Sequence, residues 1–247
     1  MGIVPSGVPR ETLTELVETA LRRDILLGVF LPSRHIRGTE AKVRYGVSAT
    51  PFREALQRLA SEGFVEIDAQ SGARVARVSR DDLKDIFALR LLLEREALRR
   101  SIENTEDEPV WSAALSISLN RYRESASSLR IGAPDLELIE AWSDAHDRFY
   151  EALYSSCGSE RLKKLIWGLL WHAQRYRAIA LHRLETEKFD LQQIDDLLAQ
   201  VEAIYGAALK RETDRAVAAL EDHLTKGETY LAKILTALER SGLNQPS

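Results

Sequence analysis

Two histidines and a tyrosine are the residues whose types and spacing could do chemistry. His146 falls within an apolar stripe of one expected helix, and Tyr150, four residues later, shares that helical face. His223 lies on another amphipathic stretch. Imidazole and phenol groups that point into one interior could line a polar pocket, and imidazole could also bind a transition metal. A histidine on an apolar face is more often a hydrogen-bonded core residue, so both interpretations stay open at this point.

The sequence points to neither a disulfide-stabilised protein nor a membrane protein. Cys157 is the single cysteine, which excludes an intramolecular disulfide and a cysteine-based metal site. No apolar run approaches the length of a membrane span, and the N-terminus does not resemble a secretory signal. No motif places a nucleophile or a base beside the histidines. We therefore expect a cytoplasmic protein that is not an enzyme.

Charge is unevenly distributed along the 247 residues. The whole chain has a formal net charge of −4. Residues 10–80 hold 12 Lys and Arg against 9 Asp and Glu, a balance of +3, so the remainder holds −7. Such asymmetry is typical of a basic nucleic-acid-binding module joined to an acidic domain.

The N-terminal part of the chain predicts three helices. Thr12 begins a capped amphipathic helix that Gly28 ends. A short helix is expected over 39–45, and Gly46 provides the turn after it. Thr50 is expected to cap the third helix, with a proline following it at the first helical position.

Two strands follow the third helix, at 64–67 and 74–78, joined by a turn at 69–72. This order is that of a winged helix-turn-helix, in which the third helix enters the DNA major groove. We place this domain at 11–78, after a flexible arm at 1–10. The third helix is predicted to bury one face and to leave outside it Phe52, Arg53, Gln57 and Arg58.

From Ser79 onward only helical patterns remain. A long helix is expected over 81–104, and polar breaks at 103–109 and 130–134 separate further helices. Residues 79–247 therefore form a second domain. The predicted fold class is mainly α, with an N-terminal winged helix-turn-helix and a C-terminal all-α helical bundle.

Several motifs resemble one family of bacterial regulators. The segment 47–56 (VSATPFREAL), followed by Leu59, 62–65 (EGFV) and 72–75 (GARV), resembles the winged helix-turn-helix of the GntR family. Segments 89–94 (LRLLLE), 147–153 (DRFYEAL) and 214–224 resemble the helical effector-binding and dimerisation domain of its FadR subfamily, called FCD. The resemblance implies a homodimeric, ligand-responsive transcription regulator that binds a near-palindromic operator in double-stranded DNA. We expect a repressor.

The resemblance also implies which residues contact DNA. Arg53 would lie in the first turn of the recognition helix, where its guanidinium can bond a phosphate or a guanine edge. Ser48 and Thr50 would donate to phosphates or only cap the helix, and Gly72 would bring the wing to the minor groove or only form its turn. Further candidates for phosphate contact are Arg44, Arg58 and Arg74.

Two arginines that are common in the family are replaced by Thr39 and Ala49, which puts the family's usual operator in doubt. Arg37, Lys42 and Arg44 would supply compensating charge. Lys42 stands where the family usually buries a small residue, which predicts a rotated or shifted short helix.

Many members of the family bind a divalent metal through one Asp and three His inside the helical domain, and a carboxylate effector binds that metal. The resemblance puts His146, Tyr150, Glu202 and His223 at these positions, so only His223 keeps its type. Zinc or a similar ion is the candidate cofactor, with His146, Glu202 and His223 as ligands and Asp147 as an alternative. Other pocket candidates, which would hold an anionic effector or simply pair with acidic neighbours, are Arg90, His172 and Arg175.

Two other functions remain open. A DNA-binding dimer whose helical domain is only structural would explain the altered metal set. A metal-dependent enzyme built on His146, Glu202 and His223 would show turnover of a substrate. Ligand-dependent release from DNA would distinguish the regulator from both.

Overall fold

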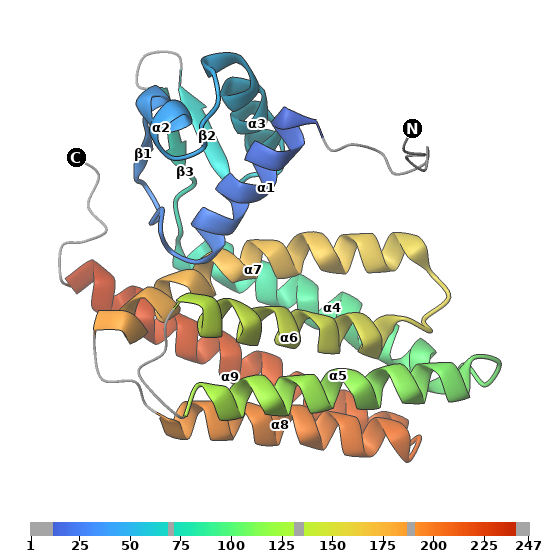
Figure 1. Ribbon diagram of the computed structural model, residues 1–247. Helices are drawn as coiled ribbons and strands as arrows, with labels where there is room; N and C mark the ends of the chain where they lie inside the picture. The colour runs from blue at the N-terminus through green and yellow to red at the C-terminus, as the bar shows by residue number, and fades with distance from the viewer. Residues whose placement is uncertain (1–11, 69–71, 131–135, 187–190, 241–247) are drawn as a thin grey trace, which may run out of the picture. The chain divides into compact units, whose positions relative to one another are not determined.

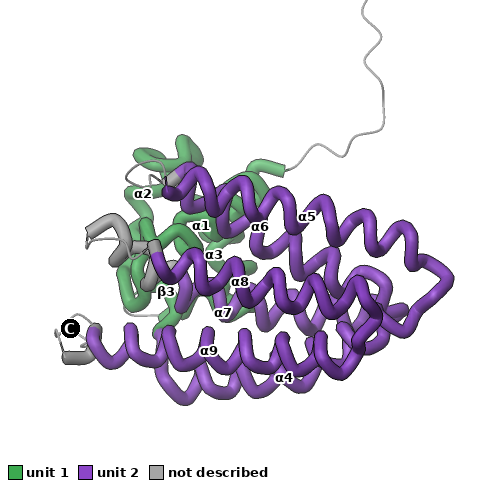
Figure 2. Tube along the Cα trace, turned by 90° about the horizontal axis from the view of Figure 1, so that it is seen from below, with its two compact units in different colours: residues 1–77 green, residues 78–247 purple. Residues whose placement is uncertain are grey.

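The computed structural model describes residues 12–68, 72–130, 136–186 and 191–240. The chain divides into two compact units, residues 1–77 and 78–247 (Figure 2). Unit 1 combines short helices with a small sheet, whereas unit 2 consists of long helices (Figure 1). The mainly α fold class predicted from the sequence is thereby confirmed. The arm predicted at the N-terminus lies outside the described residues.

Unit 1 is a winged helix-turn-helix. Thr12 caps the first helix through a reciprocal pair of bonds, in which its hydroxyl accepts from the Glu15 N–H (3.2 Å) and the Glu15 carboxylate accepts from the Thr12 N–H (2.8 Å). Gly28 lies just beyond this helix at φ +73°, a conformation that glycine adopts without strain. The elements of the unit are α1 (Leu13–Leu26), β1 (His35–Ile36), α2 (Gly38–Val43), α3 (Ala49–Ser61), β2 (Val65–Asp68) and β3 (Gly72–Val75).

The sheet of unit 1 contains a strand that the sequence did not predict. The strands are antiparallel in the order β1-β3-β2. On one side of β3, Val65 pairs with Val75, and on the other side His35 pairs with Arg74. A strand of two residues is too short to show alternation, so β1 is defined by its pairing with the hairpin and not by its own pattern.

Two details of α3 differ from the prediction. Ser48, and not Thr50, is the N-cap residue. Pro51 is therefore the third helical residue, where its missing N–H removes no intrahelical bond. Phe52 is 1% exposed and belongs to the core of unit 1, although it was expected outside. It lies four residues before Leu56 on the same helical stripe, so helical spacing itself puts it on the buried face.

Unit 2 is helical throughout its described residues. Ser79 caps its first helix, with its hydroxyl accepting a bond from the Asp82 N–H at 3.1 Å. Pro109 falls in the first turn of the next helix, where proline is tolerated. The helices are α4 (Arg80–Glu103), α5 (Glu108–Ser128), α6 (Leu136–Tyr154), α7 (Glu160–Thr186), α8 (Leu191–Leu209) and α9 (Thr213–Arg240).

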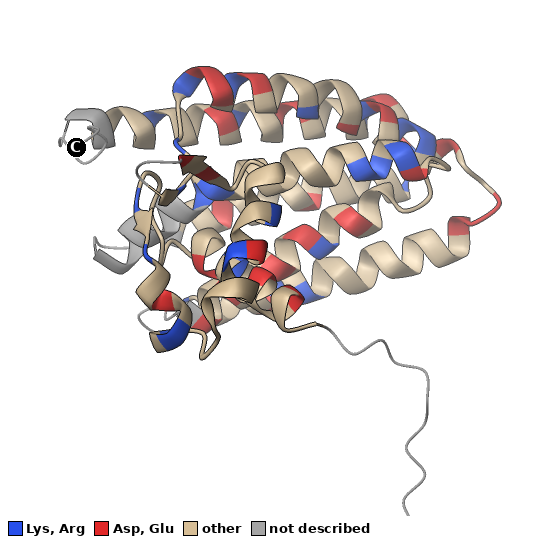
Figure 3. Cartoon of the chain, turned by 90° about the horizontal axis from the view of Figure 1, so that it is seen from above, with Lys and Arg blue, Asp and Glu red and all other residues tan. Residues whose placement is uncertain are grey.

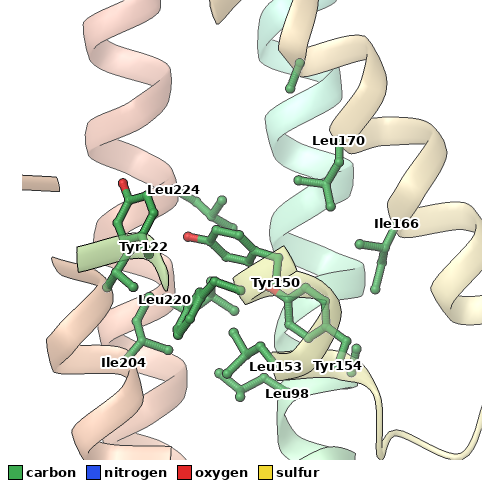
Figure 4. Close-up of a cluster of buried hydrophobic side chains, with 14 of the residues drawn as sticks. Leu98, Tyr122, Tyr150, Leu153, Tyr154, Ile166, Leu170, Ile204, Leu220 and Leu224 are labelled. Atoms are coloured by element: carbon green, nitrogen blue, oxygen red, sulfur yellow. The ribbon is translucent and has the colours of Figure 1, made fainter. Parts of the chain in front are cut away.

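The helices of unit 2 enclose one hydrophobic core. Helix α4 packs against α7 and α9, α5 packs against α6 and α8, and α8 packs against α9. Tyr122, Tyr150 and Tyr154 lie among leucine and isoleucine side chains at the centre (Figure 4). Each tyrosine buries a large apolar ring together with a hydroxyl that needs a partner. Within the described part of the chain, no helix is long and apolar enough to cross a membrane.

Candidate functional site

The exposed face of α3 presents one arginine with nothing bound to it. The buried stripe of this helix consists of Phe52, Ala55, Leu56 and Leu59. Arg53 lies off this stripe and is exposed. Its guanidinium has no ion pair or hydrogen bond within the described residues. It is therefore available to a partner in solution without breaking any contact of the fold.

The N-terminal end of α3 lies beside Arg53 in sequence. Ser48 has extended backbone angles (φ −75°, ψ 169°), and its hydroxyl makes no bond to the helix. Thr50 is exposed in the first turn. The hydroxyls of Ser48 and Thr50, and the unpaired N–H groups of the first turn, can all donate to an anion such as a phosphate.

The other arginines predicted to contact phosphates are held in ion pairs. Arg44 binds Asp24 through two bonds, Nε–Oδ2 at 2.6 Å and Nη2–Oδ1 at 3.0 Å, and this contact raises its pKa. Arg58 pairs with Glu18 at 3.3 Å, and Arg74 pairs with Glu66 at 2.9 Å. Basic and acidic segments are accordingly interspersed along the helices (Figure 3).

Two other basic residues near the turn are not paired. Arg37 and Lys42 are exposed, and neither side chain has an ion-pair partner among the described residues. Helix α2 buries Ala41 in place of Lys42, so a small residue still fills the buried position. Thr39 and Ala49, at the positions of the missing arginines, are both exposed.

The second strand of the wing, β3, begins at a position whose backbone conformation requires glycine. Gly72 is the first residue of β3 and has φ +83°, which L side chains rarely adopt. A Cβ atom at this position would meet no atom within 4 Å, so conformation and not crowding selects glycine. Gly72 is exposed, so its backbone can approach a partner.

Unit 2 contains a cavity of about 110 Å³. Most of its walls are apolar side chains, among them Phe87, Ile139, Trp142 and Leu231. Its polar lining includes Arg90, His146, Arg177 and His223. These four residues come from α4, α6, α7 and α9, and the polar lining also includes Gln193 of α8 and Tyr230 of α9. The polar part of the cavity therefore exists only where these helices meet.

Arg177 fixes the protonation of His146. Its Nη1 lies 2.7 Å from His146 Nδ1, and its Nη2 lies 2.9 Å from Asp147 Oδ1. The same Nδ1 is 3.2 Å from Asp147 Oδ1, but the guanidinium is closer and only donates hydrogen bonds. We therefore assign Nδ1 of His146 as an acceptor and place the ring proton on Nε2. Asp147 also accepts a bond from the Gln174 side-chain amide.

His223 has the opposite arrangement. Its Nδ1 lies 3.1 Å from Gln200 Oε1, an acceptor, so Nδ1 donates and Nε2 keeps a free lone pair. The ring centroids of His146 and His223 are 6.5 Å apart. The two imidazoles thus offer one donor and one acceptor, both at Nε2.

Both imidazoles are neutral near pH 7. Burial lowers the pKa of His146 to about 4, and the Arg177 guanidinium acts in the same direction. Burial lowers the pKa of His223 to about 3, and His146 and the two nearby arginines add to this. Asp147 beside Arg177 has its pKa lowered to about 2. The polar end of the cavity therefore contains neutral histidines and charged groups held in pairs.

Arg90 belongs to a second buried pair. Its Nε lies 2.6 Å from Glu94 Oε1, and the Tyr154 hydroxyl donates to Glu94 Oε2 at 2.7 Å. Arg90 and Glu94 are 5% and 0% exposed. Removing either partner would leave a buried charge unpaired, so this contact is structural even though Arg90 reaches the cavity.

Several polar atoms close to the histidines have no hydrogen-bond partner among the residues that the structure describes. They are the hydroxyls of Tyr122 and Tyr150 and the indole N–H of Trp142. The Tyr150 ring centroid is 4.8 Å from that of His146 and 5.9 Å from that of His223. The Tyr150 hydroxyl points toward the side of the cluster where Tyr122 lies (Figure 4). Buried polar groups are normally satisfied, so these atoms indicate room for a polar ligand or water.

The other predicted pocket residues do not line the cavity. Tyr150 is fully buried and is not part of the cavity lining, although its ring lies beside both histidines. Glu202 is at the surface, where it accepts a bond from Arg123 at 2.7 Å. Arg175 is 3.5 Å from Asp82, and His172 is likewise absent from the cavity lining.

Sequence reasoning missed Arg177, which lies two residues after the predicted Arg175. The buried residues Ile166, Leu170 and Ala173 follow helical spacing along α7, and Arg177 continues this stripe four residues further. Arg175 lies about half a turn away from it. The spacing of α7 therefore puts Arg177 on an inward face, but Arg175 is also buried, so spacing alone does not show which of the two lines the cavity.

A tyrosine of α7 binds the first turn of α4. The single O–H proton of Tyr176 is shared between the carboxylate of Asp82 and the carbonyl oxygen of Ser79, and the hydroxyl oxygen accepts from the Ser79 N–H. Tyr176 is 1% exposed. Tyr176, the neighbour of Arg177 in sequence, thus binds the first turn of α4. This turn directly follows the winged helix-turn-helix along the chain.

Comparisons with known proteins identify both units. Residues 13–75 match "Bacterial regulatory proteins, gntR family", and residues 85–226 match the FCD domain. The uncharacterized HTH-type transcriptional regulator BphR of Paraburkholderia xenovorans LB400 is 31% identical over 223 residues, which cover 89% of this chain and 86% of that protein. The HTH-type transcriptional repressor GlaR of Escherichia coli K12 is 30% identical over 204 residues, or 83% and 89% of the two chains. The chain belongs to the GntR family.

Solved structures agree with this GntR assignment at the level of fold. E. coli McbR/YncC superposes with a TM-score of 0.73 at 21% identity, covering 91% of this chain and 99% of that one. A GntR regulator from Rhodococcus sp. RHA1 gives a TM-score of 0.69 at 20% identity, with coverage of 91% and 98%. The protein is thus a GntR-family transcription regulator with an FCD domain, and its domains and relatives are those of regulators, which are not enzymes.

The residues of this GntR regulator do not fit the metal site predicted from the family. Glu202 pairs with Arg123 at the surface, and the described residues hold no group of three His, Cys, Asp or Glu side chains that could share an ion. A histidine that binds a metal presents a bare nitrogen and donates its other N–H to an acceptor. His146 does the reverse, because a guanidinium donates to its Nδ1 and its Nε2 is protonated. The expected ligand set is therefore not assembled.

Proposed function

We propose that this GntR-family protein is a ligand-responsive repressor that binds a near-palindromic operator as a homodimer and releases it when a small carboxylate enters the cavity of unit 2. The unpaired Arg53 on the exposed face of α3 is the observation on which the proposal depends. In a winged helix-turn-helix this face enters the major groove. Two copies would read two half-sites, which explains the choice of a near-palindrome.

The proposed repressor role draws on relatives and not on the site. GlaR and RspR of E. coli K12 are named as repressors, at 30% and 23% identity. A repressor of this kind has one conformation that binds the operator and another that does not. An effector lowers operator affinity only if it binds the second conformation more tightly than the first. The cavity and its unpartnered polar atoms supply a place for such a ligand.

The alternative function is a DNA-binding dimer whose helical domain is only structural. The buried Arg90–Glu94 pair and the filled core give that domain stability without any ligand. The cavity and its donors favour the ligand-responsive repressor, because a domain that only dimerises has no need of unsatisfied polar atoms beside an internal space.

The experiment begins with an operator selected from random double-stranded DNA by the full-length protein. Fluorescence anisotropy at fixed salt then measures operator affinity with and without a panel of small carboxylates, and light scattering measures the mass of the free protein and of the complex. We expect two chains per operator and a weaker operator complex with at least one carboxylate. Binding as a monomer would refute the dimeric operator complex. An operator affinity that no ligand changes would favour the structural alternative.

A further inference from the structure

The polar end of the cavity restricts which effector can bind. This inference about the effector rests on the proposed function. Arg177 uses one N–H on His146 and one on Asp147, so three of its five N–H groups remain within the described residues. His146 adds the N–H at Nε2. His223 adds the Nε2 lone pair as an acceptor. The indole N–H of Trp142, which also lines the cavity, has no partner in the described part of the chain.

The donors suit one carboxylate group. Arg177 is the charged donor that reaches the cavity and is not deeply buried in its own pair, since its side chain is 19% exposed against 6% for Arg90. Asp147 keeps a bond from the Gln174 amide if Arg177 turns part of its guanidinium toward a ligand. Charge-assisted bonds from a guanidinium to a carboxylate are among the stronger hydrogen bonds in proteins.

The acceptor on His223 demands a second feature of the ligand. A carboxylate oxygen placed against the bare Nε2 would bring two acceptors together, so the ligand must present a hydrogen-bond donor there. A hydroxyl group supplies this donor without adding charge. Apart from Arg90, whose charge is paired with Glu94, the remaining lining adds no charged side chain for a second carboxylate, and its other polar members are the amide of Gln193 and the phenol of Tyr230.

The size of the cavity limits the rest of the molecule. An engineered apolar cavity of about 150 Å³ holds benzene. The cavity of about 110 Å³ found here therefore suits a ligand with a short apolar chain.

We propose that this cavity binds a small hydroxy monocarboxylate without a metal ion, with Arg177 and His146 donating to the carboxylate and His223 accepting from the hydroxyl. Arg177 then supplies the positive charge that a metal supplies in the predicted family site. The ligand class is distinguished from simple fatty acids by the hydroxyl and from dicarboxylates by the single charge.

The test is calorimetry on the full-length protein after dialysis against EDTA. The probes are 2-hydroxybutyrate, 3-hydroxybutyrate, butyrate and succinate, each titrated with and without added Zn²⁺. We expect at least one hydroxybutyrate to bind in EDTA, roughly 10-fold or more tightly than butyrate, because butyrate leaves the His223 acceptor unpaired. Equal affinity for butyrate, preference for succinate, a requirement for Zn²⁺, or no binding of any probe would each overturn the proposal.

Two variants locate the site. Arg177→Gln is expected to weaken hydroxybutyrate binding by roughly 10- to 100-fold, whereas Arg177→Lys keeps the charge and loses less. Arg123→Gln is the matched control, because Arg123 is also paired with a carboxylate but lies at the surface. Unchanged binding by a folded Arg177→Gln protein would refute the role of Arg177. The comparison of probes uses the unaltered protein, so it decides the ligand class even if a variant fails to fold.

Operator binding separates this proposal from the proposed function. If another class of ligand releases the operator while the hydroxybutyrates do not bind, the repressor function stands and the ligand assignment is wrong. If a hydroxybutyrate binds but leaves operator affinity unchanged, the ligand assignment stands and the effector role is wrong.

Discussion

Replacing Arg53 by alanine is expected to weaken operator binding strongly while leaving the fold intact. Arg53 is exposed and unpaired, so its loss breaks no contact within the described residues. Surface substitutions of this kind usually change stability by less than about 0.5 kcal/mol. The melting temperature should therefore stay close to that of the unaltered protein.

The expected loss of affinity follows from the number of contacts. A bidentate arginine contact to a guanine edge is worth about 1–3 kcal/mol of discrimination. A dimer would lose two such contacts, or about 2–6 kcal/mol, which is a decrease of roughly 30-fold to 10⁴-fold in operator affinity. A contact to phosphate alone would instead weaken all sequences alike and reduce the salt dependence.

The assay is fluorescence anisotropy with the selected operator and with random DNA, each at several salt concentrations. Arg58→Ala is the matched control, since Arg58 lies on the same helix and is also exposed but pairs with Glu18. We expect a much smaller loss for this control. Unchanged operator affinity in a folded Arg53→Ala protein would show that α3 does not read DNA through Arg53.

Three further results are expected. Arg44→Ala should lower the free energy of unfolding by about 0.5–1 kcal/mol, because it breaks a partly exposed ion pair with Asp24. An unchanged free energy of unfolding in urea denaturation would show that this pair does not stabilise the fold. His146 and His223 have pKa values of about 4 and 3 when folded, against about 6.5 unfolded, so the unfolded chain binds more protons between these values. Stability should therefore decrease as the pH falls from about 7 to 4, by up to roughly 1.4 kcal/mol per pH unit for each histidine, and a flat profile of unfolding free energy against pH would contradict this. Tyr176→Phe should cost about 1–2 kcal/mol and reduce the change in operator affinity that an effector causes, and an unaltered effector response would exclude Tyr176 from the coupling.

The sequence determined the order of the elements and the faces of single helices. Helical spacing along α3 separates the buried Leu56 and Leu59 from the exposed Arg53, and the same spacing correctly applied would have buried Phe52. Gly46 and Gly72, which marked turns in the sequence, both have positive φ, although residues 69–71 of the second predicted turn lie outside the described part of the chain. These features depend on residues close together in the chain, whose relative positions a regular helix or a tight turn fixes locally.

The tertiary structure alone decided which side chains share a site. Arg44 and Arg53 are both exposed arginines of unit 1, and only the folded structure shows that Arg44 binds Asp24, 20 residues earlier. His146 and Arg177 are 31 residues apart, and their contact depends on how α6 and α7 lie in the bundle. Glu202 was matched to a metal ligand by its position in α8, yet its side chain faces Arg123 on α5. The packing of helices is set by the sum of many weak contacts between distant segments, and no spacing within one helix contains that information.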